Sequence, residues 1–117
     1  MTDAGLHHLK GMSQLQALQL NGTKITDAGL EYLQCLPKLQ RLLLNGTRVT
    51  DTGLEHLKPL SELALLSVEN AHVTDAGLEH LKELGQLQEL WLHGTQVTDA
   101  GVEKLQQALP NCHIAYR

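Results

Sequence analysis

Apolar residues recur along the chain with two alternating spacings, and these spacings predict its secondary structure. After the string Thr-Asp-Ala-Gly, apolar residues follow at intervals of three, as at Leu30, Leu33 and Leu36, which is typical of one buried helix face. A few residues later the interval becomes two, at Leu42 and Leu44, as in a strand with one buried face. Each unit is therefore expected to hold a helix of roughly two to three turns and a short strand.

This helix and strand pattern repeats every 24 residues. The string Thr-Asp-Ala-Gly-Leu begins at Thr2, Thr26 and Thr74, and close variants of it begin at Thr50 and Thr98. We therefore interpret residues 1–117 as a single domain made of the repeats 2–25, 26–49, 50–73, 74–97 and 98–117. Neither element can bury its apolar side alone, so the repeats must stack, strands in a parallel sheet on one face and helices on the other. The crossover rule makes the coil right-handed.

The polar residues inside each repeat have structural explanations. Thr26 is expected to cap its helix, and Asp27 to complement the positive end of the helix dipole. In the third repeat, Pro59 is expected to end the helix sooner than in the other repeats. A threonine ladder, interrupted by Ala71, is expected to satisfy turn backbone groups: Thr23, Thr47 and Thr95.

A glycine stands inside every predicted helix, where it costs about 1 kcal/mol relative to alanine. Its recurrence therefore predicts close packing between neighbouring coils. The positions are Gly5, Gly29, Gly53, Gly77 and Gly101.

The repeat Leu-x-x-Leu-x-Leu-x-x-Thr, followed by Val-Thr-Asp-Ala-Gly-Leu, resembles the leucine-rich repeats of about 24 residues found in many bacterial proteins. The resemblance covers essentially the whole chain. It implies an α/β fold, a right-handed leucine-rich-repeat solenoid, that acts as a protein-interaction scaffold and binds on its strand side. The third repeat departs from the pattern at Val68-Glu69-Asn70-Ala71, and the last repeat replaces the first strand leucine with Asn111. The second departure leaves the register of Cys112, Ile114 and Tyr116 open by one residue.

Only the outward strand positions are free to encode a partner, because the repeat fixes the inward ones. By alternation the outward positions are Ala17, Gln19, Asn21, Arg41, Leu43, Asn45, Leu65, Ser67, Glu69, Glu89, Trp91 and His93, followed in the last repeat by His113, Ala115 and Arg117.

Three large apolar residues, Leu43, Leu65 and Trp91, stand at these solvent-facing positions. With the polar residues around them they resemble a small interaction hot spot, an apolar centre with a polar rim. The predicted partner-binding residues are Arg41, Leu43, Leu65, Glu69, Glu89, Trp91 and His93. The alternative is that surface leucines are common and that Trp91 merely lies flat on its neighbours.

Composition and charge narrow the class of partner. A net charge of -4 provides no broad basic surface, which disfavours nucleic acid and anionic membranes as the main partner. We expect no membrane span and no secretion signal, because no long apolar run and no charged-then-apolar leader follows Met1. Cys35 and Cys112 lie three repeats apart, too far for a disulfide, so both should be reduced. These features favour the cytoplasm while leaving the localisation open.

No enzyme activity, cofactor or metal is expected. His56 and His80 share one helix position and follow Glu55 and Glu79, a combination that zinc could use. Neighbouring helices are about 8–10 Å apart, however, so a solvated helix face explains these residues better. The recurring aspartates, Asp27 among them, could indicate a calcium site or paired catalytic carboxylates. Their position at helix N-termini, where a negative charge is favoured, explains them better. Catalytic motifs such as Gly-x-Ser-x-Gly or His-Glu-x-x-His do not occur.

Three function classes follow from these observations. The first is a protein-binding module that uses the strand face. The second is a structural spacer, or a self-associating repeat segment of a larger protein. Its adhesive part would be the first coil, whose strand from Leu15 to Leu20 carries no charge and is expected to associate or fray. The third is an enzyme or metal protein, for which the sequence provides no site.

Overall fold

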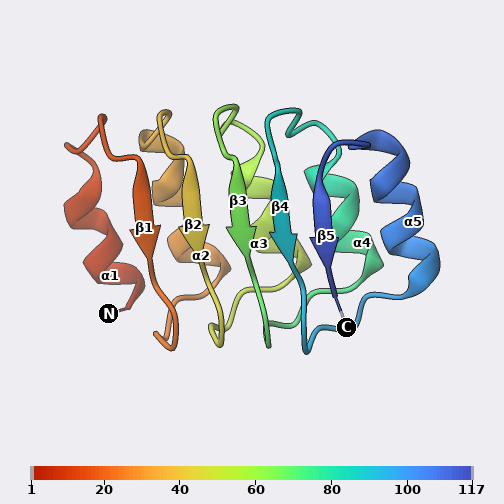
Figure 1. Ribbon diagram of the computed structural model, residues 1–117. Coiled ribbons are helices and arrows are strands. Elements are labelled where there is room, and N and C mark those ends of the chain that lie inside the picture. Colours follow the sequence, from red (N-terminus) through yellow and green to blue (C-terminus); the bar gives the residue numbers. More distant parts are fainter. Residues whose placement is uncertain (1, 117) are drawn as a thin grey trace.

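The computed structural model describes residues 2–116 and shows one parallel sheet backed by a layer of helices (Figure 1). As the chain advances, each strand descends on one face and each helix returns behind it, which gives a right-handed coil (Figure 1). Met1 and Arg117 lie outside the described residues. The strands lie in sequence order and are β1 (Ala17–Gln19), β2 (Arg41–Leu43), β3 (Leu65–Ser67), β4 (Glu89–Trp91) and β5 (His113–Ala115). The expected right-handed α/β solenoid is confirmed.

Every strand pairs with its neighbour at an offset of one repeat. Leu42 stands opposite Leu18 on one side and Leu66 on the other. The register that the last repeat left open is settled, because His113 pairs with Glu89, one period earlier. His113 and Ala115 therefore face outward as expected, whereas Arg117 lies outside the described residues.

The first four helices are single α-turns that tighten into 3-10 turns. They are α1 (Asp3–Leu6) with η1 (His7–Leu9), α2 (Asp27–Leu30) with η2 (Glu31–Cys35), α3 (Asp51–Leu54) with η3 (Glu55–Leu57), and α4 (Asp75–Leu78) with η4 (Glu79–Leu81). The last helix, α5 (Asp99–Ala108), is longer and regular throughout.

The effect expected of Pro59 holds only in part. The η3 helix ends at Leu57, sooner than η2, which ends at Cys35, but η1 at Leu9 and η4 at Leu81 end at the equivalent residue without a proline. The chain turns there in any case, because the buried Leu60 donates its N–H to the Leu57 carbonyl at 2.9 Å. Pro59 therefore lies within a turn that other repeats form without a proline.

The core runs as a continuous column of aliphatic side chains between the sheet and the helices. In the second coil all six inward leucines are fully buried: Leu30, Leu33, Leu36, Leu39, Leu42 and Leu44. The first coil has a neighbour on one side only, and Leu9, Leu15 and Leu18 at equivalent positions are only partly buried. Met12 in the same coil is 49% exposed.

Neighbouring coils are joined by a ladder of aspartate and threonine. The carboxylate of Asp27 accepts the Thr50 N–H at 2.7 Å and the Thr50 hydroxyl at 2.5 Å. The same two bonds join Asp3 to Thr26, Asp51 to Thr74 and Asp75 to Thr98.

This ladder corrects the expected role of Thr26 as a helix cap. Its side chain makes no capping bond, and its hydroxyl donates to the preceding coil. Thr74 and Thr98 make the same donation and also cap their helices, by accepting from the N–H groups of Ala76 and Gly101. The aspartates do stand in the first turn of each helix, yet their carboxylates are also committed to the next coil. The dipole interpretation of the aspartate column was therefore incomplete.

The glycine column is explained by the same contact. A Cβ added to Gly77 would lie 2.4 Å from Oδ1 of Asp51, a distance that no real contact allows. Gly29, Gly53 and Gly101 face the aspartate of their preceding coil in the same way. The predicted close packing between coils is confirmed, and the group that each of these glycines packs against is the aspartate carboxylate of the preceding coil.

At the last coil other side chains satisfy the groups that a following coil would meet. The Tyr116 hydroxyl donates to Asp99 Oδ1 at 2.7 Å. The Gln106 amide nitrogen donates to the carbonyl oxygens of Leu109 and Cys112 at 2.9 and 2.8 Å.

The two cysteines are free, as expected, and differ in environment. Cys35 is exposed and Cys112 is buried. Burial raises the pKa of the Cys112 thiol to about 11, and the nearby Glu89 carboxylate contributes in the same direction. Cys112 is therefore a neutral packing group at physiological pH.

Replacing a buried leucine of a strand should destabilise the solenoid strongly. We expect Leu42→Ala to lower the free energy of unfolding by about 2 to 5 kcal/mol, because the vacated volume lies between two packed coils. Gln40→Ala, at an exposed position two residues earlier, should stay within about 0.5 kcal/mol. Chemical denaturation measures both values, and a loss below about 1 kcal/mol for Leu42→Ala would contradict the buried assignment.

The close contact between the helix glycines and the aspartate carboxylates predicts that replacing one of these glycines with alanine lowers stability instead of raising it. In a helix, glycine to alanine normally adds about 1 kcal/mol of stability. We expect Gly77→Ala instead to remove about 1 to 3 kcal/mol, since the new methyl group collides with the Asp51 carboxylate. Gly85→Ala is the control: this glycine lies in the exposed turn after η4, nothing lies within 4 Å of its added Cβ, and its replacement should cause no loss of stability. Thermal melts that show stabilisation by both variants would contradict the close contact.

Candidate partner-binding face

The outward side chains form rows that cross the sheet. Because the register is constant, Arg41, Leu65 and Glu89 lie side by side in a first row. Leu43, Ser67 and Trp91 form the second row. Asn45, Glu69 and His93 follow at the strand ends, each two residues beyond the second row. All seven predicted partner-binding residues therefore fall on three adjacent coils of one face.

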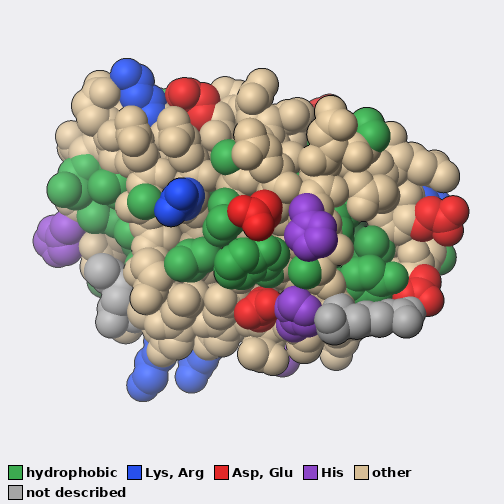
Figure 2. Space-filling model, in the orientation of Figure 1, with side chains coloured by type: hydrophobic (Ala, Val, Ile, Leu, Met, Phe, Trp, Pro, Cys, Tyr) green, Lys and Arg blue, Asp and Glu red, His purple; other side chains and the backbone are tan. Residues whose placement is uncertain are grey.

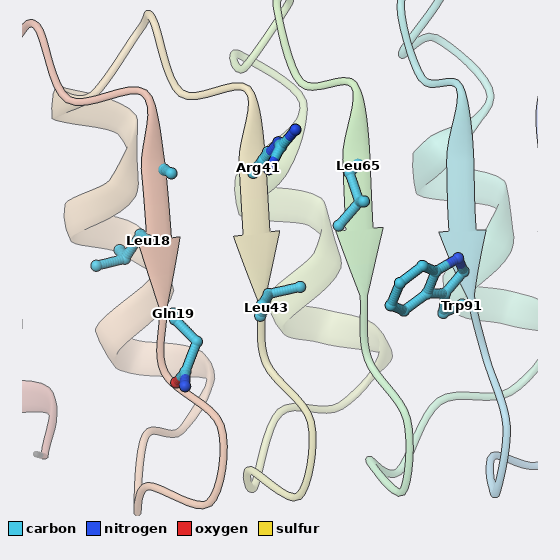
Figure 3. A pocket seen from close by; sticks show the side chains of 7 residues that line it. Leu18, Gln19, Arg41, Leu43, Leu65 and Trp91 are labelled. Atoms are coloured by element: carbon cyan, nitrogen blue, oxygen red, sulfur yellow. The ribbon is translucent and has the colours of Figure 1, made fainter.

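Four of the seven residues line a common hollow of about 390 Å³ (Figure 3). Leu43 extends from β2 and the Trp91 ring from β4, and both reach toward β3, where Leu65 stands between them (Figure 3). Arg41 lies at one end of this hollow and Gln19 at its β1 side (Figure 3). We call this hollow the strand-face groove; its lining is completed by Ala17 and Leu18.

Ser67 is buried although it stands on the outer face of the sheet. It has no exposed surface, and Leu43 and Trp91 flank it in the register. Its expected solvent-facing position was therefore wrong, because the larger side chains of the same face cover it. Trp91 is itself partly buried, so it does lie on its neighbours, and it forms a wall of the groove at the same time.

Two asparagines that were counted among the free positions hold the sheet together. Asn45 Oδ1 accepts the Ser67 hydroxyl at 2.6 Å and the Glu69 N–H at 2.7 Å. Asn21 Oδ1 accepts the Asn45 N–H at 2.8 Å. Their recurrence in the Asn-Gly turn one period apart was the sequence signal for this structural role.

Glu69 takes the position of these asparagines in the third coil and uses its carboxylate differently. Glu69 Oε2 lies 2.5 Å from His93 Nδ1, so two predicted site residues contact each other directly. Both lie outside the groove lining, at its β3 and β4 end. Asn70 follows with a positive φ of 60°, the backbone conformation that Gly22, Gly46 and Gly94 adopt in the other turns.

Figure 2 shows hydrophobic side chains gathered in the middle of the strand face, with charged side chains on either side of them. Arg41 and Glu89 stand on either side of Leu65 in the first row, and these three residues also line a second hollow. The arrangement matches an apolar centre with a polar rim.

The helix face brings no comparable group together. Among residues 2–116, no three or more His, Cys, Asp or Glu side chains are placed to hold a metal ion. His56 Nδ1 instead lies 3.3 Å from the Gln34 amide nitrogen. Within the same part of the chain, none of the helices has the length and apolar character that crossing a membrane requires.

Comparison with known proteins identifies the repeat and the fold. A family model described as leucine-rich repeat matches residues 12–33. Comparison with curated protein sequences gives no significant match. The 24-residue periodicity of the helices and strands fits the same repeat class.

Several solved structures superpose on more than nine tenths of the chain. Internalin C2 from Listeria monocytogenes matches with a TM-score of 0.78 and 29% identity, over 93% of this chain and 45% of that one. The actin-binding site 2 of leiomodin-1 matches at 0.75 and 18% identity, over 98% of this chain and 78% of that one. A leucine-rich-repeat protein from Leptospira interrogans matches at 0.61 and 22% identity, over 91% and 32%. The chain thus spans less than half the length of that internalin.

Proposed function

We propose that this leucine-rich-repeat solenoid is a protein-binding module whose partner docks on the strand face, over Leu43, Leu65 and Trp91. The observation that carries the proposal is the strand-face groove, which joins these three side chains with Arg41. Apolar side chains held together on an outer face, next to charged groups, are the usual composition of a binding hot spot.

The fold and its neighbours support this class of function. Leucine-rich-repeat domains are typically interaction scaffolds, and the leiomodin-1 segment of the same fold is named for binding actin. The inward side chains and the asparagines are committed to the solenoid, as the Asn45 bonds illustrate. The residues proposed for recognition are Arg41, Leu43, Leu65, Glu69, Glu89, Trp91 and His93.

Self-association through the first coil is a second candidate. Met12 is 49% exposed, and a shallow apolar hollow at Leu15 adjoins it. Leu18 is only partly buried, whereas the equivalent Leu42 is fully buried. A second copy that covers this coil would complete the column of leucines, as stacked repeats do.

Removing the Trp91 side chain should abolish capture of a partner by the strand face. The purified chain and its Trp91→Ala variant would be used as baits, and we expect the variant to lose at least about 2 kcal/mol of binding, or more than about tenfold. Lys58→Ala, at an exposed helix-face position, is the control and should retain the partner. Circular dichroism melts confirm that each bait is folded. A partner held equally by wild type and Trp91→Ala would count against the strand face.

The first coil should be the adhesive or the least protected part of the chain. We expect concentration-dependent association in sedimentation experiments that Met12→Lys weakens, or else amide exchange that is fastest in the first coil. Met12 is a better site for the added charge than Leu18, because the Met12 side chain is exposed and its replacement leaves the core intact. A strict monomer at high concentration together with uniform exchange protection in all coils would exclude this second candidate.

A further inference from the structure

The geometry points to an occupant of defined chemistry for the strand-face groove: an extended peptide segment that carries a carboxylate two residues away from a large apolar side chain. The inference rests on the proposed function and specifies its partner. The apolar side chain would enter between Leu43, Leu65 and Trp91, and the carboxylate would meet Arg41.

The size and shape of the groove favour a side chain over a free small molecule. Its volume of about 390 Å³ is at the lower end for ligand pockets, which usually bury most of their ligand in a cleft. This hollow is open on the face of a sheet, and its walls are two leucines and the face of an indole (Figure 3). One aliphatic or aromatic side chain from a passing segment fills such a site.

The polar groups at the β1 and β2 side of the groove are hydrogen-bond donors. Within residues 2–116, the guanidinium of Arg41 has no ion pair and no side-chain hydrogen bond. Gln19 uses its amide oxygen to accept the Asn21 N–H at 2.8 Å, which leaves its amide nitrogen to donate. Arg41 can only donate and therefore selects an acceptor, and a carboxylate matches the planar guanidinium with two parallel hydrogen bonds.

The opposite side of the groove carries the opposite charge. Glu89 stands beyond Leu65 in the first row, and Glu69 is engaged with His93 at the end of β3. A carboxylate is therefore favoured near Arg41 and disfavoured near β4, so the acidic end of the motif lies over β2. The net charge of -4 opposes this contact little, because salt screens charges beyond about 8 Å.

The spacing of the two recognition elements follows from strand geometry. Neighbouring strands lie about 4.8 Å apart. The centre of the groove is one strand across from Arg41 and is displaced toward the second row, where Leu43 and Trp91 stand, so the diagonal from Arg41 is about 6 to 8 Å. In an extended segment, side chains on the same side recur every two residues, about 7 Å apart. One intervening residue therefore places the carboxylate over Arg41 while the apolar side chain occupies the groove.

Trp91 provides a direct readout, because it is the single tryptophan of the chain and forms a wall of the groove. A display library of random linear peptides would be selected on the wild-type protein. Enriched peptides without tryptophan would then be synthesised with Glu, Gln or Lys at the acidic position and titrated against Trp91 emission. We expect enrichment of an acidic residue two positions from Leu, Ile or Phe, and about tenfold weaker binding for the Gln peptide.

Charge exchange separates this inference from a general affinity for peptides. Arg41→Glu should weaken the Glu peptide by about tenfold or more and strengthen the Lys peptide. Arg48→Glu, which makes the same charge change at an exposed position outside the groove, should leave both titrations unchanged.

The possible failures are distinguishable. If peptide binding depends on Trp91 but its affinity changes equally in Arg41→Glu and Arg48→Glu, the contact between the carboxylate and Arg41 would be wrong. The proposed function would still stand. Peptides that bind without perturbing Trp91 emission and survive Leu43→Gln would overturn the groove itself. A selection that enriches no peptide would overturn a linear segment as the occupant, while the capture experiment with Trp91→Ala would still test the proposed function.

Discussion

The structure depends on one constraint: no coil can bury its own apolar side, so each must fit against the coil before it. The fit is set by the Asp27 carboxylate, which bonds the Thr50 backbone and hydroxyl and lies against Gly53. A charged group this close to backbone is stable only when its oxygens are satisfied, and the threonine does this twice. Three residue types in fixed positions thereby hold the period at 24 residues.

That period determines which side chains remain available for recognition. Constant register keeps the inward leucines buried and places the outward residues in rows. Part of the outer face is also committed, since Asn45 bonds Ser67 and Glu69 across to the next coil. The outward side chains that make no bond to the solenoid remain available for the proposed recognition, and Arg41 is the clearest example among the described residues.

Periodicity predicted the coil, the sheet, its handedness and the inward leucines, because each follows from burial of one face of a repeated unit. It could not predict contacts whose partner lies one period away, and the errors at Thr26 and Ser67 arose there. Thr26 had a plausible local role as a cap, whereas its hydroxyl reaches Asp3 in the preceding coil. Alternation likewise placed Ser67 in solvent, because alternation defines a direction and says nothing about neighbours that cover the position.

The third coil links these two aspects of the molecule. It departs from the repeat at Glu69 and Ala71, so it lacks the threonine that elsewhere bonds the turn, as Thr47 bonds Leu44. Asn70 supplies the left-handed turn in place of glycine, and Glu69 bonds His93 in the following coil. These residues directly follow β3, the strand that carries Leu65 and the buried Ser67. Of the four full repeats, the one that departs most from the consensus is thus at the centre of the proposed binding face, where recognition would use side chains that the repeat does not provide.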